Sequence, residues 1–434
     1  MDQETTQPPF DAVIVDGGRI PFQRSGTEYK KLMAYDLGRM AIEGLIGRSA
    51  INGEDLDRVI MGTVIQEVNT SNVARESALG AGIPNSVPAH TVTQACISSN
   101  QAITSAVELI RSGQSKIILA GGTETMSDIP IRFRKKFRQK LLDARKYKSI
   151  SDFLKFFKGL RPSHLLPEIP SISEFTTGET MGESCDRMAA HFGISRKAQD
   201  EYALRSHQLA TKATNEGLLD QELLPAATPP DFDPIKHDNT FREDTSMEKL
   251  EQLSPAFIKP HGTITAGNSS ALTDGASASL IMEKETALDR GLKPKAILRG
   301  YTYVAQDPED ELLLGPAYAT PKVLDMMGLQ LSDIDVFEFH EAFAGQILTV
   351  LKALNSDKFA KEKLSRDKKV GEIPMDKFNC WGGSLSLGHP FGATGVRLVT
   401  TAANCLHHED GQLALVAACA AGGQGHAIIL ERFE

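Results

Sequence analysis

The sequence lacks three features that mark particular classes of protein: a long apolar run, closely spaced cysteines and an excess of basic residues. No stretch reaches the roughly 20 apolar residues that a membrane-spanning helix needs. Five cysteines are scattered over 434 residues without the short spacings of a zinc site or a disulfide framework, which indicates a reducing compartment. A net charge of −9 argues against nucleic acid as a general partner. The acidic segment 1–4 fits neither a secretory signal nor an arginine-rich transit peptide.

The sequence does contain an internal repeat. Residues 50–62 resemble residues 328–340, and residues 112–120 resemble residues 410–418. In each pair a helix end and a turn lead into a short apolar strand, and helical periodicity alternates with continuous apolar runs. Such runs suit strands that are buried on both faces of a sheet. The pattern therefore predicts two copies of one α/β unit arranged in layers.

Two cysteines stand where an apolar run meets a turn rich in small residues: Cys96 precedes Ile-Ser-Ser-Asn, and Cys419 precedes Ala-Ala-Gly-Gly. The repeat assigns the Cys96 segment and the Gly-His-Pro segment of His389 to equivalent strand-to-helix junctions, which facing copies would bring to one cleft. A helix from Asn100 onward would lower the pKa of the Cys96 thiol, so we predict that Cys96 is a nucleophile. The remaining cysteines are interpreted as small core residues: Cys185, Cys380 and Cys405.

Four motifs, taken together and in order, resemble those of the thiolases. They are Cys96 before a helix, the His-Glu-Ala-Phe segment from His340, the Gly-His-Pro turn at His389, and Cys-x-x-Gly-Gly-x-Gly from Cys419. The resemblance covers essentially the whole chain, and within the family it is greatest to the thiolase β-subunits of trifunctional fatty-acid β-oxidation complexes. It implies an α/β thiolase fold, with duplicated α/β halves in five α-β-α-β-α layers and an inserted loop domain.

The resemblance also divides the chain and suggests its partners. Residues 1–125 and 272–291 are expected to form the N-terminal half, residues 126–271 the loop domain and residues 292–434 the C-terminal half. Thiolases generally pair through the edge strand of the first copy, so we expect a homodimer. It would lie within a heteromeric complex with an enoyl-CoA hydratase/3-hydroxyacyl-CoA dehydrogenase subunit. The expected location is the bacterial cytoplasm or the mitochondrial matrix.

The implied activity is degradative cleavage of 3-ketoacyl-CoA by coenzyme A, which yields acetyl-CoA and an acyl-CoA shortened by an acetyl unit. Condensation to acetoacetyl-CoA by the same residues is an alternative, because the motifs do not decide the direction. A catalytically silent lipid-transfer or scaffold protein is another, although such a protein would not need both thiols. Coenzyme A is a substrate in this scheme, and we expect no bound cofactor or metal.

The chemistry assigns a role to each reactive group. Cys96 would attack the 3-keto carbon, with His389 as its base. Cys419 would protonate the departing enolate, while His340 and His389 would stabilise the enolate oxygen, directly or through a water. The resemblance implies that the backbone N–H groups of Cys96 and Ala421 hold the thioester oxygen. This chain departs from most thiolases in having His340 in place of Asn, and Ala421 where Gly is common.

The resemblance places coenzyme A beside the small residues that follow the loop domain. Ser270 matches the serine that hydrogen-bonds the pantetheine arm, and Ala266 lies in the same Thr-Ala-Gly-Asn-Ser-Ser segment. Met181 matches a residue that lines the tunnel, and Phe343 is a further expected contact. Arg242 falls where an arginine packs on the adenine.

The segment 131–161 is exceptionally basic, with twelve Lys and Arg against two Asp in a chain of net charge −9. Apolar residues recur in it at helical spacing: Ile150, Phe153, Leu154, Phe157 and Leu160. This combination is typical of a helix that lies in a membrane interface or against a partner. The alternative is a solvated basic face that helps to bind the phosphates of coenzyme A.

Overall fold

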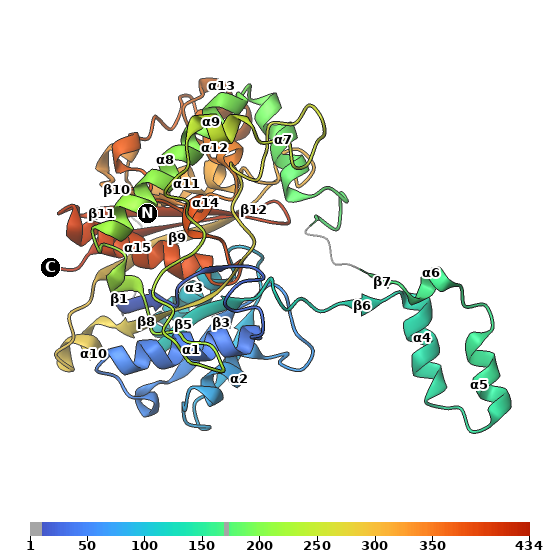
Figure 1. Cartoon of the computed structure of the whole chain (residues 1–434). Coiled ribbons are helices and arrows are strands. Elements are labelled where there is room, and N and C mark those ends of the chain that lie inside the picture. The colour runs from blue at the N-terminus through green and yellow to red at the C-terminus, as the bar shows by residue number, and fades with distance from the viewer. Residues whose placement is uncertain (1–10, 169–172) are drawn as a thin grey trace, which may run out of the picture.

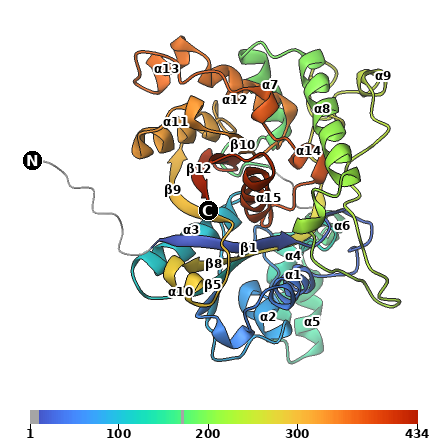
Figure 2. The same ribbon diagram turned by 90° about the vertical axis from the view of Figure 1, so that its left-hand side faces the viewer.

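The computed structural model of the chain describes residues 11–168 and 173–434. Segment 1–4, on which the prediction about targeting signals depends, lies outside the described residues. Helices and strands alternate in five layers, which Figure 2 shows edge-on from α11 and α12 through the two sheets to α1 and α2. The predicted layer order is therefore confirmed.

The strands form one hydrogen-bonded path with two halves. The first half has the order β1-β8-β5-β3-β4, and a two-residue strand, β2 (Gln23–Arg24), pairs with β8. The second half has the order β10-β11-β12-β9. A short antiparallel contact between β1 and β9 joins the halves. The strands are β1 (Ala12–Arg19), β3 (Arg58–Gly62), β4 (Ala89–Val92), β5 (Ile117–Glu124), β8 (Thr273–Glu283), β9 (Ala296–Ala305), β10 (Val336–Phe339), β11 (Leu413–Ala420) and β12 (Gln424–Arg432).

The central layer consists of α3 (Ser98–Arg111) and α15 (Thr394–His408), which lie between the two sheets (Figure 2). Every residue of α15 from Thr394 to Leu406 is buried, as expected for a helix covered on all sides. Alternate residues of β11 face opposite clusters, since successive side chains of a strand point to opposite faces. Ala414, Val416 and Ala418 pack against the central helices, whereas Leu415, Ala417 and Cys419 pack outward.

The outer layers complete both halves. They contain α1 (Ala34–Arg48), α2 (Val73–Gly80) and α10 (Lys284–Asp289) on one side, and α11 (Gly315–Met327), α12 (Ala344–Leu354) and α13 (Asp357–Lys363) on the other. The predicted repeat is visible in the structure. A turn of 3-10 helix at Gly53–Asp55 leads into β3, and an equivalent turn at Leu331–Asp333 leads into β10.

The segment between β5 and β8 is inserted into the first half, because these two strands are direct neighbours in the sheet. Its helices α7 (Met181–His191) and α8 (Arg196–Asn215) pack against α12, and α9 (Met247–Glu251) packs against α8. The basic part of the insertion is an arm that projects from the body (Figure 1). The arm consists of β6 (Arg132–Phe133), α4 (Lys135–Ala144), α5 (Ile150–Phe157), α6 (Pro162–Leu165) and β7 (Pro167–Glu168).

The arm differs in one respect from the sequence prediction. Leu160 was expected to continue the apolar face of the helix, but α5 ends at Phe157. Gly159 has a φ of +75°, a left-handed conformation that ends helices, so Leu160 lies beyond the turn. Within the described residues, no helix combines the length and apolar character needed to cross a membrane.

Candidate active site

Cys96 is presented by a tight turn that leads into α3. Ala95 has a φ of +46°, which is uncommon for a residue with a β-carbon. The hydroxyl of Ser98 stabilises this turn, since it donates to the carbonyl of Ala95 and accepts the N–H of Gln94. Cys96 keeps partial access to solvent, whereas Cys419 is buried at the end of β11.

Two imidazole rings lie beside Cys96. His340 follows β10, and its backbone N–H extends the sheet by donating to the carbonyl of Ala417. His389 lies between α14 (Ser384–Leu387) and α15. The ring centroids of His340 and His389 are 4.1 Å apart. The Cys96 sulfur and one nitrogen of each ring all lie within 4.8 Å of one another, so the predicted meeting of these three groups occurs in the structure.

Each ring is held through Nδ1 and leaves Nε2 without a protein partner. Nδ1 of His340 lies 2.8 Å from the hydroxyl oxygen of Ser384, and Nδ1 of His389 lies 2.7 Å from that of Thr394. Both Nε2 atoms are buried and have no hydrogen-bond partner in the described protein. Buried polar atoms normally have partners, so these two nitrogens are available to a bound molecule.

The pKa of Cys96 corrects the sequence prediction of a thiol that ionises easily. Loss of water around the sulfur raises the pKa to about 12, and the nearby carboxylate of Glu124 adds to the increase. The backbone N–H groups of Ala421 and Cys96 oppose this increase, because they face the sulfur. Burial lowers the pKa of His389 to about 3. The free chain therefore holds a neutral thiol beside a neutral ring.

Cys419 belongs to the same site. Burial raises the pKa of its thiol, and the proximity of Cys96 raises it further. Ala421 lies just beyond Cys419, and its N–H faces the Cys96 sulfur from the opposite half of the molecule. The predicted binding site for the thioester oxygen requires hydrogen-bond donors, and the backbone N–H groups of Cys96 and Ala421 are donors in this position.

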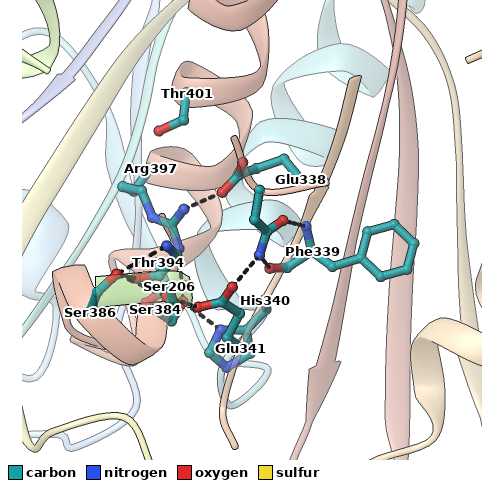
Figure 3. A network of polar contacts seen from close by, with 12 residues as sticks. Ser206, Glu338, Phe339, His340, Glu341, Ser384, Ser386, Thr394, Arg397 and Thr401 are labelled. Carbon is teal, nitrogen blue, oxygen red and sulfur yellow. Dashed lines mark hydrogen bonds and ion pairs between the residues drawn. The ribbon is translucent and has the colours of Figure 1, made fainter. Parts of the chain in front are cut away.

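Glu341, next to His340, anchors the second half of the site (Figure 3). Its carboxylate accepts hydrogen bonds from the side chains of Tyr202, Ser206 and Asn379 and from the backbone N–H of Leu385. Because these donors come from α8, from α14 and from the segment just before α14, one buried carboxylate connects the loop domain to the segments that carry both histidines.

Comparison with known proteins decides the family. The model for the thiolase N-terminal domain matches residues 12–285, and that for the thiolase C-terminal domain matches residues 292–432. The chain belongs to the thiolase family. It is 60% identical over 97% of its length to the mitochondrial trifunctional enzyme subunit beta of Bos taurus, 88% of which is covered. It is 43% identical to a 3-ketoacyl-CoA thiolase of Yersinia enterocolitica, with 96% of each chain covered.

Solved structures agree with this assignment. Human mitochondrial 3-ketoacyl-CoA thiolase in complex with CoA is similar to this thiolase with a TM-score of 0.84 and 29% identity, over 98% of each chain. The Bacillus anthracis acetyl-CoA acetyltransferase is similar with a TM-score of 0.83 and 31% identity, over 98% of this chain and 99% of that one. The predicted family and fold are therefore confirmed.

A cleft beside the loop domain contains two of the five predicted coenzyme A contacts, Arg242 and Ala266. Met181 and Phe343 lie instead in the apolar cluster that includes Cys419, where the Phe343 ring packs edge-on against Phe257. Ser270 connects this region to the second half, because its N–H donates to the carbonyl of Ala342.

Three basic residues that line this cleft were not predicted from the sequence: Arg24, His207 and Lys249. Burial lowers the pKa of His207 to about 4, and the neighbouring Arg242 and Arg24 add to the effect. The basic residues of the cleft come from separate segments, so no local sequence motif predicts it. The positions of Lys and Arg on the folded surface were needed to find it.

The donor atoms of Cys96, His340 and His389 also satisfy the geometric condition for a metal site. A thiolate and two imidazoles are ligands that zinc prefers. Added Zn²⁺ would therefore find three ligands in this cluster.

Proposed function

We propose that this thiolase is degradative and cleaves 3-ketoacyl-CoA with coenzyme A. The products are acetyl-CoA and an acyl-CoA shortened by an acetyl unit. One observation carries the proposal: the Cys96 sulfur lies within 4.8 Å of two imidazole nitrogens and is faced by backbone N–H groups from both halves. The name of the similar Yersinia enterocolitica protein, 3-ketoacyl-CoA thiolase, supports it.

In the first half-reaction, the Cys96 proton moves to Nε2 of His389 as the sulfur attacks the 3-keto carbon. The N–H groups of Cys96 and Ala421 stabilise the resulting oxyanion. When the oxyanion collapses, the bond between C2 and C3 breaks and its electron pair forms the enolate of acetyl-CoA. Cys419 donates a proton to C2, while His340 and the protonated His389 stabilise the enolate oxygen.

In the second half-reaction, coenzyme A replaces acetyl-CoA and loses its thiol proton to the Cys419 thiolate. The sulfur of coenzyme A attacks the acyl-Cys96 thioester, and the bond from the acyl carbon to the Cys96 sulfur breaks. The departing Cys96 thiolate takes the proton back from His389. Both thiols and the ring return to their starting states, so no external acid, base or cofactor is consumed. Condensation by the reverse steps uses the same residues.

The charged cleft supports the proposal that coenzyme A enters through it, because Arg24 and Arg242 line it and suit the phosphates. Lys249 also lines the cleft, but it forms an ion pair with Asp244. Ala266 lines the same cleft. Met181 and Phe343 belong to the apolar cluster of Cys419, and the N–H of Ser270 donates to the carbonyl of Ala342 in the same region, where the pantetheine arm and the acyl chain would run.

We further propose that the chain forms a homodimer through β4. Among the described residues this strand ends the sheet path and its only strand partner is β3, so its other edge can accept a further strand, although the Asn72 side chain already donates to the carbonyl of Ala89. By contrast, the edge of β10 is covered, since the backbone and side chain of Asn379 bond Phe337 and Phe339. The name of the Bos taurus relative, trifunctional enzyme subunit beta, supports a larger complex with a hydratase/dehydrogenase subunit, and its mitochondrial origin favours the matrix.

The arm supports a proposal of peripheral membrane contact. Ile150, Leu154 and Phe157 lie on one face of α5 and expose 83%, 68% and 67% of their surfaces. A contiguous apolar face of this kind, surrounded by lysines, suits an anionic lipid surface. No described residue of the arm lines the cleft around Arg242, which argues against a main role in binding coenzyme A phosphates.

The activity can be tested by following the absorbance of a 3-ketoacyl-CoA after addition of coenzyme A, across several chain lengths. The wild-type chain should consume the substrate, and Cys96→Ser should reduce kcat/KM by at least about 1000-fold. Without coenzyme A, mass spectrometry should detect an acyl group on Cys96 in the wild type only. Wild-type turnover by Cys96→Ser would overturn the mechanism, and an inactive wild type would favour the scaffold alternative.

A further inference from the structure

Ser384 stands between Arg397 and His340 at the start of α14. Its hydroxyl oxygen accepts a hydrogen bond of 2.7 Å from Nη2 of Arg397 and lies 2.8 Å from Nδ1 of His340 (Figure 3). All three side chains are buried, with at most 1% of their surface exposed. Among the described residues, the Ser384 hydroxyl has no other partner.

Arg397 gives this chain of hydrogen bonds a direction. A guanidinium group can only donate, so the serine oxygen must be its acceptor. The hydroxyl hydrogen then has one acceptor in reach, Nδ1 of His340. If Nδ1 instead carried a hydrogen toward Ser384, the hydroxyl hydrogen would be buried without an acceptor, which is strongly disfavoured. Glu338 holds Arg397 in place through a buried ion pair.

The His340 ring is neutral in the free chain, because burial, the neighbouring His389 and Arg397 hold its pKa well below the usual range. A neutral imidazole carries one hydrogen. When Nδ1 accepts from Ser384, that hydrogen resides on Nε2, the buried ring atom that has no partner in the described protein.

We propose that Ser384 and Arg397 are positioning residues that hold His340 in the tautomer with hydrogen on Nε2. The ring then presents a fixed hydrogen-bond donor to the enolate oxygen and cannot act as a base at that atom. The catalytic consequence depends on the proposed thiolase reaction, whereas the tautomer is a property of the folded chain and can be measured separately.

The neighbouring ring is held differently. Thr394 can donate its hydroxyl hydrogen to the carbonyl of Pro390, at 3.0 Å, so its oxygen is free to accept from Nδ1 of His389. His389 can therefore carry its hydrogen on Nδ1 and leave a lone pair on Nε2 for the Cys96 proton. The Ser384 hydroxyl donates to one ring, whereas the Thr394 hydroxyl accepts from the other. His340 therefore becomes a hydrogen-bond donor at Nε2, and His389 becomes a base at Nε2.

The tautomer can be measured by nitrogen NMR of the full-length protein labelled with ¹⁵N-histidine. The His340 signals are assigned by their loss in His340→Asn. We expect the Nε2 resonance of His340 to be that of a protonated nitrogen and the Nδ1 resonance that of an unprotonated one at pH 7. A protonated Nδ1 would overturn the proposal, whether or not the chain cleaves 3-ketoacyl-CoA.

A kinetic cycle tests the consequence. Ser384→Ala should lower kcat for 3-ketoacyl-CoA cleavage by about 10- to 100-fold with KM changed less than about twofold, because one oxyanion donor is weakened. Asn at position 340 donates from a fixed amide, so adding Ser384→Ala to His340→Asn should change kcat by less than about twofold. A penalty of equal size in both backgrounds would mean that Ser384 acts on packing alone and would overturn the positioning role.

Ser386→Ala is the matched control. Ser386 lies in the same short helix and is buried, but its hydroxyl contacts Ser206 and the backbone of Gly383 and does not contact a ring. The Ser386→Ala variant should leave kcat for 3-ketoacyl-CoA cleavage within about twofold of the wild type. A loss like that of Ser384→Ala would show that any cavity in α14 disturbs the site and would count against the proposal.

Discussion

The hydroxyl of Tyr202 donates a 2.7 Å hydrogen bond to the carboxylate of Glu341, and this contact connects the loop domain to the residue next to His340. Because the Glu341 carboxylate accepts four hydrogen bonds in a buried position, its contribution can be measured as stability.

Glu341→Gln should destabilise the fold by about 2–4 kcal/mol, since the amide NH₂ replaces an acceptor and leaves buried donors unpaired. The measurement is the free energy of unfolding in urea at pH 7. Tyr202→Phe is the control and removes a single hydrogen bond, so it should cost about 1 kcal/mol. An unchanged unfolding midpoint for Glu341→Gln would contradict the anchoring role.

Alkylation of Cys96 by iodoacetamide should accelerate with pH and show no plateau up to pH 10, because the thiol has a pKa of about 12 in the free chain. The rate should rise about tenfold per pH unit, since only the thiolate reacts. Mass spectrometry of the Cys96 peptide gives the rate. A plateau between pH 7 and 8 would instead indicate a thiolate that exists before substrate binds.

Buried histidines should make the fold sensitive to acid. The pKa of His426 is lowered to about 3 by burial, whereas in the unfolded chain it titrates near 6.5. Only the unfolded state therefore takes up a proton as the pH falls from about 6.5 toward 3, and the free energy of unfolding decreases. His426→Gln should reduce the decrease in the free energy of unfolding between pH 7 and pH 5.5 by roughly 1 kcal/mol. An unchanged pH dependence would contradict the buried neutral state.

The arm should bind membranes that contain anionic lipids. Liposome flotation should recover the wild type, and replacing the Lys and Arg residues of segment 134–148 by Gln should abolish recovery, because each basic residue near an anionic surface contributes about 1 kcal/mol. Liposomes of neutral lipid serve as the control. Thiolase activity should be unchanged, since no described residue of the arm lines the cleft around Arg242. Equal flotation of both proteins would remove the proposed lipid contact.

Chelation should leave the activity intact, because the proposed steps use side chains and backbone N–H groups and involve no metal ion. Added Zn²⁺ should inhibit by binding Cys96, His340 and His389, and EDTA should reverse the inhibition. The measurement is the cleavage rate before and after dialysis against EDTA. Loss of activity on dialysis, with recovery at stoichiometric zinc, would mean that the cluster is a metal site.

Much of the architecture could be predicted from the sequence because it depends on local patterns. The repeat of 50–62 in 328–340 corresponds to equivalent turns before β3 and β10. The helical periodicity that alternates with the apolar runs corresponds to helices such as α3 and α15. The end of α5 was missed although the signal was present. Gly159 terminates the helix, and the apolar spacing alone did not reveal it.

The sequence by itself determined the family, the layered fold and the reactive residues, since motif order and apolar periodicity are properties of the chain. Only the tertiary structure decided how those residues behave. Burial raises the pKa of Cys96, although a helix start alone predicted the opposite. The partners of His340, the hydroxyl of Ser384 and the guanidinium of Arg397, come from other segments. A pKa and a tautomer depend on the solvent and hydrogen-bond partners around a group, and folding supplies both.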